Sequence, residues 1–588
     1  MNDTPVTLDD AAGARRAASV IVLRDGQAGG GAPEVLMLRR AERDGDMRSG
    51  VWVFPGGVLD AVDATLHGRC DGDTAAAADE RLGLPAGAMD YVVAAIRECA
   101  EEVGLLFASG GDTAAALREL SGLRSGGDFV ALCERHGLRL DAGALAYHSH
   151  WLTPPGLPKR FDTRFFVARA PAGQVAVADE GEAVEIAWFT PAQALDKARA
   201  HESTKGRSRV DSPPLGGGGG PGPSPGGPIK LLPVTRETLK DLARFDTVDA
   251  CLAEARARRH PPRTMPRLGC NAAGQVRPVL PGEWAYAEIA RLDPAGAGTV
   301  CFELPPLRPV VLSERVTRVT CNNGSVMTGP GTNTYLLKAP GGDEVTVLDP
   351  GPDDADTEAH LQAVLAAAAP ARVVRILTTH THKDHSPAAR RLAELTGAPV
   401  VGCVAGHPEW QDAHFAPQHQ PVDGERLVLG PGATLRAVVT PGHASNHVCW
   451  LLEEEGLLFT GDHVMQGSTV VINPPDGDMA AYFASLQRLL AVDGLRWFAP
   501  GHGFLMAEPQ AEVRKLIAHR LGREAKVAAA LREAGPATVD ALVPTVYGDV
   551  PAARHGIAAR SLTAHLLKLA RDGRARQDGE TWHSLDKE

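Results

Sequence analysis

Short apolar runs of strand length alternate with longer helical patterns in two separate parts of the chain. In the first part, we expect strands over residues 18–23, 35–38, 51–54, 160–169 and 183–188, and a helix over residues 90–108. In the second part, strands are predicted over residues 310–319, 333–337, 345–348, 373–379, 435–439, 457–460 and 497–499. Between them, residues 235–258 have a helical period and residues 261–309 are predicted to be mostly loop. This alternation predicts two α/β domains.

The last part of the chain has a different pattern. Helices are predicted over residues 512–533, 539–543 and 559–570, and the last of these places Leu562, Leu566 and Leu569 on one face. Residues 574–583 then read as a β-hairpin that turns at Asp578-Gly579. Three helices followed by a hairpin predict a winged helix.

Composition narrows the class of protein. The 588 residues are 44% hydrophobic and 22% charged, with a net charge of −12, which excludes wholesale disorder and disfavours a general nucleic-acid coat. No stretch approaches ~18 consecutive apolar residues, so no membrane-spanning helix is expected. The nine cysteines are scattered without a Cys-x-x-Cys pair, and we expect reduced thiols in the cytoplasm.

A histidine–aspartate constellation follows predicted strands of the second α/β part. The residues concerned are His380, His382, Asp384 and His385 after one strand, and then His443, Asp462 and His502, each after a later strand and beside glycine. Imidazole and carboxylate ligands suit zinc and other borderline divalent ions. Seven such residues are enough for two ions, which can hold a bridging hydroxide. By contrast, the helical histidines His360, His519 and His565 are expected to be structural.

These residues resemble the metallo-β-lactamase superfamily, over roughly residues 309–505. The resemblance implies an αββα sandwich with two zinc ions at the edge of its sheets. It assigns His380, His382 and His443 to the first ion, Asp384, His385 and His502 to the second, and Asp462 to both. Asp384 would also orient the attacking water. His463, next to Asp462, is either an outer partner of the site or structural.

One branch of that superfamily is more similar still. Met327-Thr-Gly-Pro-Gly331 with the residues after it, Leu348-Asp-Pro-Gly351 and the winged-helix tail resemble the β-lactamase-like protein 2 group. That group includes an endoribonuclease for single-stranded RNA. Glyoxalase II thioesterases share the metal motif without this tail. The ligands themselves do not decide whether a phosphodiester or a thioester is cut.

A second constellation lies in the first α/β part. Glu98, Glu101 and Glu102 have i+3 and i+4 spacing, so three carboxylates share one face of a helix behind the turn Gly56-Gly57. Carboxylates held this close repel one another unless a cation joins them, and their hard oxygens suit Mg²⁺ or Mn²⁺. The alternative is a solvated acidic face.

The turn and the acidic helix together resemble the Nudix box, which implies a Nudix α/β/α fold. Asp63 stands where the box has Glu, and 33 residues separate it from Arg97, which is an insertion. A Nudix branch that includes peroxisomal coenzyme A diphosphatases carries long insertions here. The resemblance assigns metal binding to Glu98, Glu101 and Glu102, catalysis to Glu98 and Glu102, and a helix-orienting pairing with a carboxylate to Arg97. It offers Glu182 or Glu185 as an extra ligand.

The expected organisation is a Nudix-like domain over residues 1–265, a connecting segment over 266–308, a hydrolase domain over 309–508 and a winged helix over 509–588. The Gly/Pro-rich tract 212–228 is predicted to be a loop within the first domain. The expected function is bifunctional. The C-terminal half would hydrolyse single-stranded RNA or a thioester, and the Nudix half would cleave a nucleoside diphosphate derivative such as coenzyme A. Alternatively, only the C-terminal half is catalytic, as a glyoxalase II-like thioesterase, and the Nudix half is a nucleotide-binding sensor.

Overall fold

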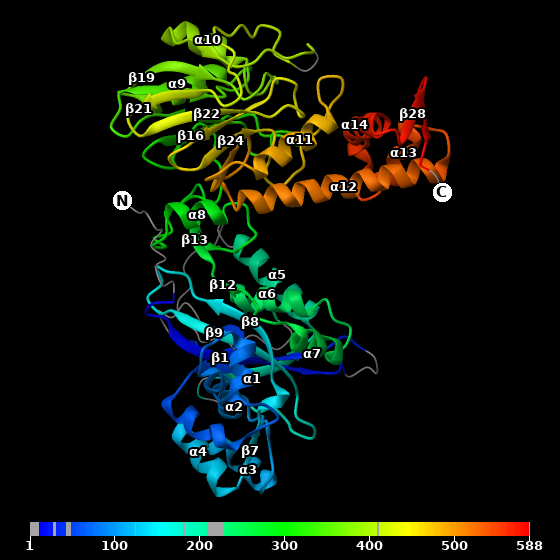
Figure 1. Cartoon of the computed structure of the whole chain (residues 1–588). Helices are drawn as coiled ribbons and strands as arrows, with labels where there is room; N and C mark the ends of the chain where they lie inside the picture. Colours follow the sequence, from blue (N-terminus) through cyan, green and yellow to red (C-terminus); the bar gives the residue numbers. More distant parts are fainter. Residues whose placement is uncertain are drawn as a thin grey trace. The chain divides into compact units, whose positions relative to one another are not determined.

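The computed structural model of the chain separates into two compact units (Figure 1). The first comprises Met1–Arg267 with Ala295–Ala297, and the second comprises Leu268–Pro294 with Gly298–Glu588. The structure describes residues 11–26, 31–42, 49–123, 125–179, 181, 183–207, 227–408 and 411–586. Nearly all of the predicted Gly/Pro-rich loop therefore lies outside the described residues.

The first unit is built on a nine-stranded mixed sheet with strand order β11-β3-β2-β1-β9-β8-β12, to which β10 and β4 add by pairing with β2 and β1. The strands are β1 (Arg15–Arg24), β2 (Glu34–Arg40), β3 (Val51–Val53), β4 (Gly56–Val58), β8 (Ala146–Leu152), β9 (Phe161–Arg169), β10 (Ala183–Phe189), β11 (Lys230–Leu231) and β12 (Arg263–Thr264). β1 pairs with β9 in parallel, from Arg15 opposite Phe161 to Leu23 opposite Arg169.

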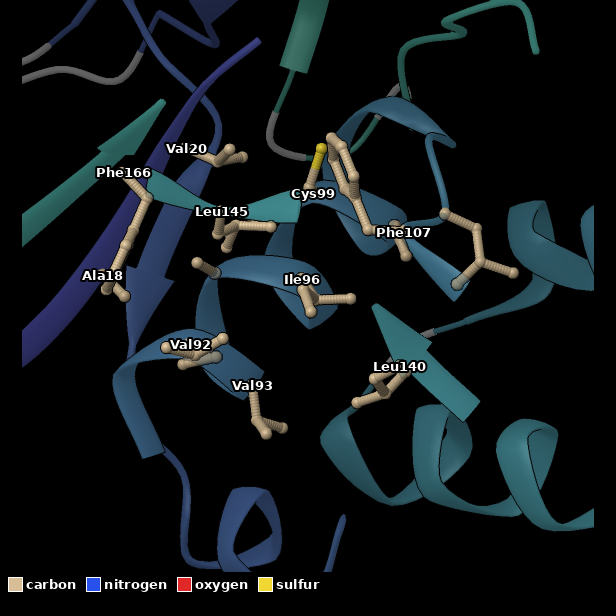
Figure 2. Close-up of a cluster of buried hydrophobic side chains, with 14 of the residues drawn as sticks. Ala18, Val20, Val92, Val93, Ile96, Cys99, Phe107, Leu140, Leu145 and Phe166 are labelled. Atoms are coloured by element: carbon tan, nitrogen blue, oxygen red, sulfur yellow. The ribbon is translucent and has the colours of Figure 1, made fainter. Parts of the chain in front are cut away.

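Both faces of this sheet are covered, because apolar residues occupy both faces of the central strands. On β1, Val20 and Val22 belong to one buried cluster, whereas Ile21 belongs to the other. The first cluster includes helix α2 (Ala88–Val103), and the second includes α5 (Pro191–Arg207), α6 (Pro233–Leu242) and α7 (Val248–Ala257). Figure 2 shows the first cluster, with Ile96 of α2 among the side chains around it. The predicted α/β/α fold is confirmed.

The residues inserted between Asp63 and Arg97 form small elements beside α2. They are η1 (Ala61–Arg69), β5 (Cys70–Asp71) and α1 (Ala75–Leu82). After α2 come β6 (Ala108–Ser109), α3 (Thr113–Glu119), η2 (Leu120–Gly122), α4 (Gly126–Arg135), β7 (Arg139–Asp141) and η3 (Ala142–Ala144). β5, β7 and β6 pair as a separate three-stranded sheet. The insertion therefore has its own structure, and its Leu66, Ala78 and Leu82 join the core of α2.

Two of the expected elements were wrong in extent, because each is divided in the structure. The helix expected over 235–258 is two helices, α6 and α7, because Thr247 caps α7 by accepting a hydrogen bond from the backbone N–H of Ala250 at 3.2 Å. The strand expected over 310–319 is a hairpin. Ser313 Oγ accepts a hydrogen bond from the backbone N–H of Arg315 at 3.1 Å and stabilises the turn.

The second unit contains two six-stranded mixed sheets. The first has the order β15 (Pro309–Val311), β16 (Val316–Thr320), β17 (Asn333–Leu337), β18 (Glu344–Leu348), β19 (Arg372–Leu377) and β20 (Val400–Val401). The second has the order β21 (Arg426–Gly430), β22 (Ala433–Val439), β23 (Val448–Leu452), β24 (Leu457–Gly461), β25 (Trp497–Pro500) and β26 (Met506–Ala507).

Alternation along the strands determines how these sheets pack. Tyr335 of β17 and Trp450 of β23 share one buried cluster, which lies between the two sheets. Leu336 belongs instead to the cluster of α9 (Thr357–Ala368) and α10 (Ala388–Thr396). Leu451 belongs to the cluster of α11 (Met479–Leu490) and α12 (Pro509–Ala534). Helices thus cover both outer faces, and the predicted αββα sandwich is confirmed.

The segment expected to be mostly loop packs onto this sandwich. It forms β13 (Arg267–Cys270), β14 (Val276–Val279) and helix α8 (Tyr286–Leu292). Glu288 of α8 is buried and accepts two hydrogen bonds from the equally buried Arg318, at 2.7 and 2.8 Å. It also accepts one from the backbone N–H of Leu505 at 2.8 Å. Most of the segment is loop, as predicted, and this buried pairing holds its short helix on the sandwich.

The winged helix is confirmed at the C-terminal end. α12 continues into β27 (Ala537–Thr538), α13 (Val539–Val546), η4 (Ala552–Arg554), α14 (His555–Arg571), β28 (Ala575–Asp578) and β29 (Thr581–Ser584). Its core includes the predicted Leu562, Leu566 and Leu569. Figure 1 shows α12 as one long helix that runs past α11 to α13. Among the described residues, no helix combines the length and the apolarity needed to cross a bilayer.

Candidate functional site

The histidines and aspartates of the second unit lie on loops that follow β19, β22, β24 and β25. β18 and β19 are parallel, and so are β24 and β25, so their carboxyl ends lie on one edge of each sheet. The two edges are joined at the site, because the backbone N–H of Asn333 donates to the carbonyl of Gly501 at 2.7 Å. Four loops that are distant in sequence therefore converge.

All seven predicted residues are brought together, in two groups. One group is His380, His382 and His443, and the other is Asp384, His385, Asp462 and His502. Within each group, one donor atom per residue lies within 4.8 Å of the others. Five of the seven are buried, whereas His382 and Asp384 are partly exposed. The Asp384 side chain is 27% exposed, so this carboxylate borders both the cluster and the solvent.

Asp462 lies between the two groups. Its Oδ2 is 3.8 Å from His443 Nε2 in the first group. Its Oδ1 is 3.4 Å from His385 Nε2 and 3.3 Å from His502 Nε2 in the second. One carboxylate thus turns an oxygen to each group, which is the geometry that a bridging ligand requires.

The donor set fits divalent cations. Among the described residues, four buried atoms of the site have no hydrogen-bond partner: His385 Nε2, His443 Nε2, His502 Nε2 and Asp462 Oδ1. Leaving such atoms unsatisfied in a protein interior is costly, at about 1–3 kcal/mol each. A cation at each group would satisfy them, so the cluster is suited to metal ions.

The electrostatics of the cluster point the same way. Burial lowers the pKa of His382 to about 3, so this imidazole is neutral and able to ligate. Burial alone would lower the pKa of His502, but Asp462 and Asp384 beside it raise the pKa to about 9. The two carboxylates thus favour a positive charge between them, either on the imidazole or on a bound cation.

Outer contacts fix the orientation of three of these imidazoles. His385 Nδ1 lies 3.0 Å from Asp349 Oδ2, His443 Nδ1 lies 2.8 Å from the carbonyl of Val471, and His502 Nδ1 lies 3.2 Å from the carbonyl of Gly331. Each contact directs Nε2 inward. Asp349 also accepts hydrogen bonds from the backbone N–H and the hydroxyl of Thr379, at 2.7 and 2.8 Å. Sequence reasoning used the Leu348-Asp-Pro-Gly351 motif only as a family marker and missed this role.

Two further histidines are buried at the centre. His463 joins neither donor group, and its ring packs edge-on against Tyr482 with 4.8 Å between centroids. His447 was not predicted. It stacks on His380 at 5.1 Å, and its Nδ1 lies 2.9 Å from Thr440 Oγ1. Neither donor group includes the helical residues His360, His519 and His565, which accords with the structural role expected for them.

The carboxylates of the first unit are arranged around Arg97 at the C-terminal end of α2. Arg97 Nη1 donates to Glu98 at 2.7 Å and to Glu101 at 3.1 Å. Glu102 accepts a hydrogen bond from the backbone N–H of Gly56 at 2.8 Å, which ties the helix to the turn before it. At Gly57, an added Cβ would lie 2.3 Å from Glu98 Cδ, so a side chain there would displace the Glu98 carboxylate. The predicted helix and turn do meet, but a guanidinium lies between two of the carboxylates.

Asp63 is the partner that orients Arg97. Its two oxygens accept from Arg97 Nε at 2.8 Å and Nη2 at 3.2 Å, and both side chains are buried. The predicted pairing of Arg97 with a carboxylate is confirmed, and the shorter Asp serves in place of the Glu of the box. The insertion between the two residues leaves this pairing intact.

The Glu101 carboxyl has an unusually high pKa. Burial, more than the neighbouring Glu98, raises the pKa of Glu101 to about 7, against the opposing effect of Arg97. Its Oε1 is buried without a hydrogen-bond partner among the described residues. Of the suggested extra ligands, Glu182 lies outside the described residues, and Glu185 accepts a hydrogen bond from Arg39 at 2.9 Å.

Three family models match the chain. The model for the metallo-beta-lactamase superfamily matches residues 327–502, that for the beta-lactamase associated winged helix domain matches 538–582, and that for the NUDT19 Nudix domain matches 73–204.

Curated relatives match about half of the chain. An atrochrysone carboxyl ACP thioesterase from Aspergillus fumigatus is 34% identical over 295 residues, which cover 47% of this chain and 87% of the relative. A beta-lactamase-like protein 2 homolog from Caenorhabditis elegans is 30% identical over 263 residues, covering 45% and 86%. Among solved structures, a metallo-beta-lactamase family protein from Thermus thermophilus is 24% identical with a TM-score of 0.40, covering 47% of this chain and all of its own.

The converging His/Asp loops, the αββα sandwich and the match to most of the length of the curated relatives agree with one another. The chain belongs to the metallo-β-lactamase superfamily, and it carries an N-terminal Nudix domain and a C-terminal β-lactamase-associated winged helix.

Proposed function

We propose that the protein is a bifunctional metal-dependent hydrolase whose second unit cleaves acyl thioesters. The observation that carries this proposal is the pair of donor groups joined by Asp462, in a chain that covers 87% of a relative named as an ACP thioesterase. The substrate class is an acyl group on a phosphopantetheine arm, either of a carrier protein or of coenzyme A. Zinc is the proposed metal, because imidazole and carboxylate donors suit zinc and other borderline divalent ions.

The roles of the residues follow from their positions. Two bound ions would supply a water of lowered pKa and stabilise the negative charge that develops on the thioester oxygen. His380, His382 and His443 would hold one ion, and Asp384, His385 and His502 the other, with Asp462 between them. Burial alone would raise the pKa of Asp384, but His385 and His502 lower that pKa to about 2. Asp384 is therefore ionised at neutral pH and would orient the attacking water by accepting a hydrogen bond.

The first unit would cleave a nucleotide pyrophosphate such as that of coenzyme A. Glu98, Glu101 and Glu102 would hold Mg²⁺ or Mn²⁺, with Glu98 and Glu102 as the catalytic pair. Both units would then act on the same molecule, because acyl-coenzyme A contains a thioester and a pyrophosphate. The covalent linkage of the two units is what motivates this pairing.

A nucleotide sensor is the second candidate for the first unit. Arg97 Nη1 lies within hydrogen-bonding distance of both Glu98 and Glu101, where a cation would otherwise join them. In that case the unit would bind nucleotide without turnover.

Cleavage of single-stranded RNA is the second candidate for the second unit, favoured by the winged helix. Three cations of that segment are paired with carboxylates, which weakens this candidate. Lys568 pairs with Glu524 at 3.1 Å and with Asp572 at 2.7 Å, Arg571 pairs with Asp478, and Arg574 pairs with Asp586 at 2.8 Å. These cations are already neutralised within the protein.

Incubation of the metal-loaded chain with octanoyl-coenzyme A, followed by mass spectrometry, tests both activities. Wild type should release octanoate and cut the pyrophosphate, His382→Ala should lose only the first activity, and Glu102→Gln only the second. Thioester hydrolysis that survives His382→Ala would contradict the proposal. If Glu102→Gln leaves the pyrophosphate products unchanged, the first unit is not the pyrophosphatase. An end-labelled single-stranded RNA in parallel, cut by wild type and not by His382→Ala, would favour the nuclease.

A further inference from the structure

Helix α12 carries two buried arginines that make contacts in different parts of the second unit. Arg520 is 3% exposed and Arg523 is 8% exposed. Arg523 donates to Asp549 at 2.8 and 2.9 Å and lies over the ring of Tyr547, so these contacts are all within the winged helix. Arg520 contacts the loop and the helix that support the metal centre.

We propose that Arg520 is a positioning residue for the metal centre, so that the winged-helix segment completes the hydrolase site rather than serving as a separate module. This inference rests on the metal binding assigned above to His443 and Asp462. It does not depend on which bond the enzyme cuts.

The first link runs through the loop after Asp462. Arg520 Nη2 donates a hydrogen bond to the carbonyl of Val470. The next carbonyl, that of Val471, is the partner of His443 Nδ1 at 2.8 Å. Val470 and Ile472 are buried on either side, so the short segment has little freedom to move. By holding this segment, Arg520 keeps the carbonyl of Val471 in place. This carbonyl in turn orients His443 with Nε2 toward the metal.

The second link runs through α11. The Arg520 guanidinium lies 5.5 Å from the ring centroid of Tyr482, which is fully buried. The Tyr482 hydroxyl donates to the carbonyl of His463 at 2.9 Å, directly after Asp462. At Gly442, an added Cβ would lie 2.4 Å from Tyr482 Cα, so the loop that carries His443 rests on α11. Movement of Tyr482 would thus displace both the loop that carries His443, in one donor group, and the loop that carries Asp462, in the other.

Other contacts of the winged-helix segment hold α11 in place. Arg571 of α14 pairs with Asp478, the N-cap residue of α11. The backbone N–H of Asp478 donates to the carbonyl of Gly442 at 2.8 Å. Lys568 lies 5.4 Å from the ring centroid of Phe483. Arg520 is the residue in this set that contacts both the carbonyl loop and Tyr482.

Metal binding by the full chain tests the proposal without any substrate. The apo protein is titrated with Co²⁺ against a competing chelator, and the d–d absorption bands report the coordination of the bound ions. We expect Arg520→Ala to weaken the binding of one ion by roughly 10- to 100-fold and to change its bands, as loss of an outer partner does. Arg520→Lys keeps a donor for Val470 and should recover part of the affinity.

Arg523→Ala is the matched control, because it removes an equally buried arginine from the same helix. It should lower the midpoint of thermal unfolding but keep the wild-type Co²⁺ affinity and spectrum. Equal weakening by Arg520→Ala and Arg523→Ala, or wild-type binding by Arg520→Ala, would overturn the proposal. If Arg520→Ala does not fold, Tyr482→Phe removes a single oxygen from the second link. It should change the Co²⁺ bands in the same direction, and unchanged bands would refute that link.

Thioester hydrolysis is measured separately on the same preparations. A wild-type chain that binds Co²⁺ but does not cleave thioesters contradicts the proposed substrate and leaves the positioning role as it stands. A wild-type level of Co²⁺ binding in Arg520→Ala contradicts the positioning role and leaves the proposed substrate as it stands. The two failures are therefore distinguishable.

Discussion

The two candidate sites differ in what lies between their charged groups. In the first unit, Arg97 lies between Glu98 and Glu101 and is itself held by Asp63, so a cation of the protein already lies among the carboxylates. In the second unit, the Nε2 atoms of His385 and His502 face Asp462 without hydrogen bonds. The first site is thus partly neutralised by its own arginine, whereas the unsatisfied atoms of the second are suited to a bound cation. We therefore expect the second unit to depend more on a metal ion.

Removal of the bridging carboxylate should have the largest effect. Asp462→Ala takes away the oxygens that face both donor groups, so we expect fewer than two ions per chain and a loss of thioester hydrolysis on the order of 1,000-fold. Metal analysis and initial rates measure the two results. His360→Ala, which removes a buried histidine outside both groups, is the control. An Asp462→Ala chain that keeps both ions would show that Asp462 is not needed to hold them.

Replacement of Asp63, the partner of Arg97, should mainly lower the free energy of unfolding of the first unit. Asp63→Ala leaves a buried guanidinium without its strongest acceptor, which typically costs about 3–5 kcal/mol. Denaturant unfolding of the variant beside wild type measures the loss. The double variant Asp63→Ala with Arg97→Met removes the guanidinium as well but leaves Glu98 and Glu101 without their cation, so it should not recover wild-type stability. If the single variant is as stable as wild type, Asp63 does not hold the site together.

Loss of an outer contact in the second unit should have an intermediate effect on metal affinity. Asp349→Asn replaces the carboxylate that orients His385 and accepts from Thr379, and we expect affinity to fall roughly 10- to 100-fold. Competition with a chelator gives the value. Asp354→Asn, on the same connection but outside the donor groups, should retain wild-type affinity. Equal affinities for Asp349→Asn and wild type would show that the imidazole does not need this partner.

The smallest expected effect is a pH dependence of stability in the first unit. The folded-state pKa of Glu101 is raised from 4.5 to about 7, mainly by burial. The folded state therefore binds the proton more tightly than the unfolded state does. In metal-free buffer, stability should fall as pH rises from about 4.5 to about 7. Above that range, the loss of stability due to Glu101 should stay constant. Thermal unfolding of wild type and Glu101→Gln at several pH values checks this. A constant difference between the two chains across the range would contradict it.

Much of the fold and of the second site was predictable because the relevant signals are local. The apolar run over residues 457–460, for example, matches strand β24 (Leu457–Gly461). The ligand motif around His380 and His382 is contiguous, and each later ligand follows a recognisable strand. The carboxylates Glu98, Glu101 and Glu102 share a helix face by spacing alone.

The remainder depended on contacts between residues far apart in the sequence. Whether Glu98 and Glu101 face a metal or Arg97 depends on the packing of Asp63, 34 positions before Arg97. The ion pair between Glu288 and Arg318 gives structure to a segment that was predicted to be mostly loop. The roles of Asp349, His447 and Arg520 likewise appear only when the sheets and helices are assembled.

Sequence by itself determined the two α/β domains, the winged helix and the candidate metal ligands, because hydrophobic period and ligand spacing act over a few residues. Tertiary structure alone decided which charges meet, because burial and hydrogen bonding depend on the packing of the whole unit.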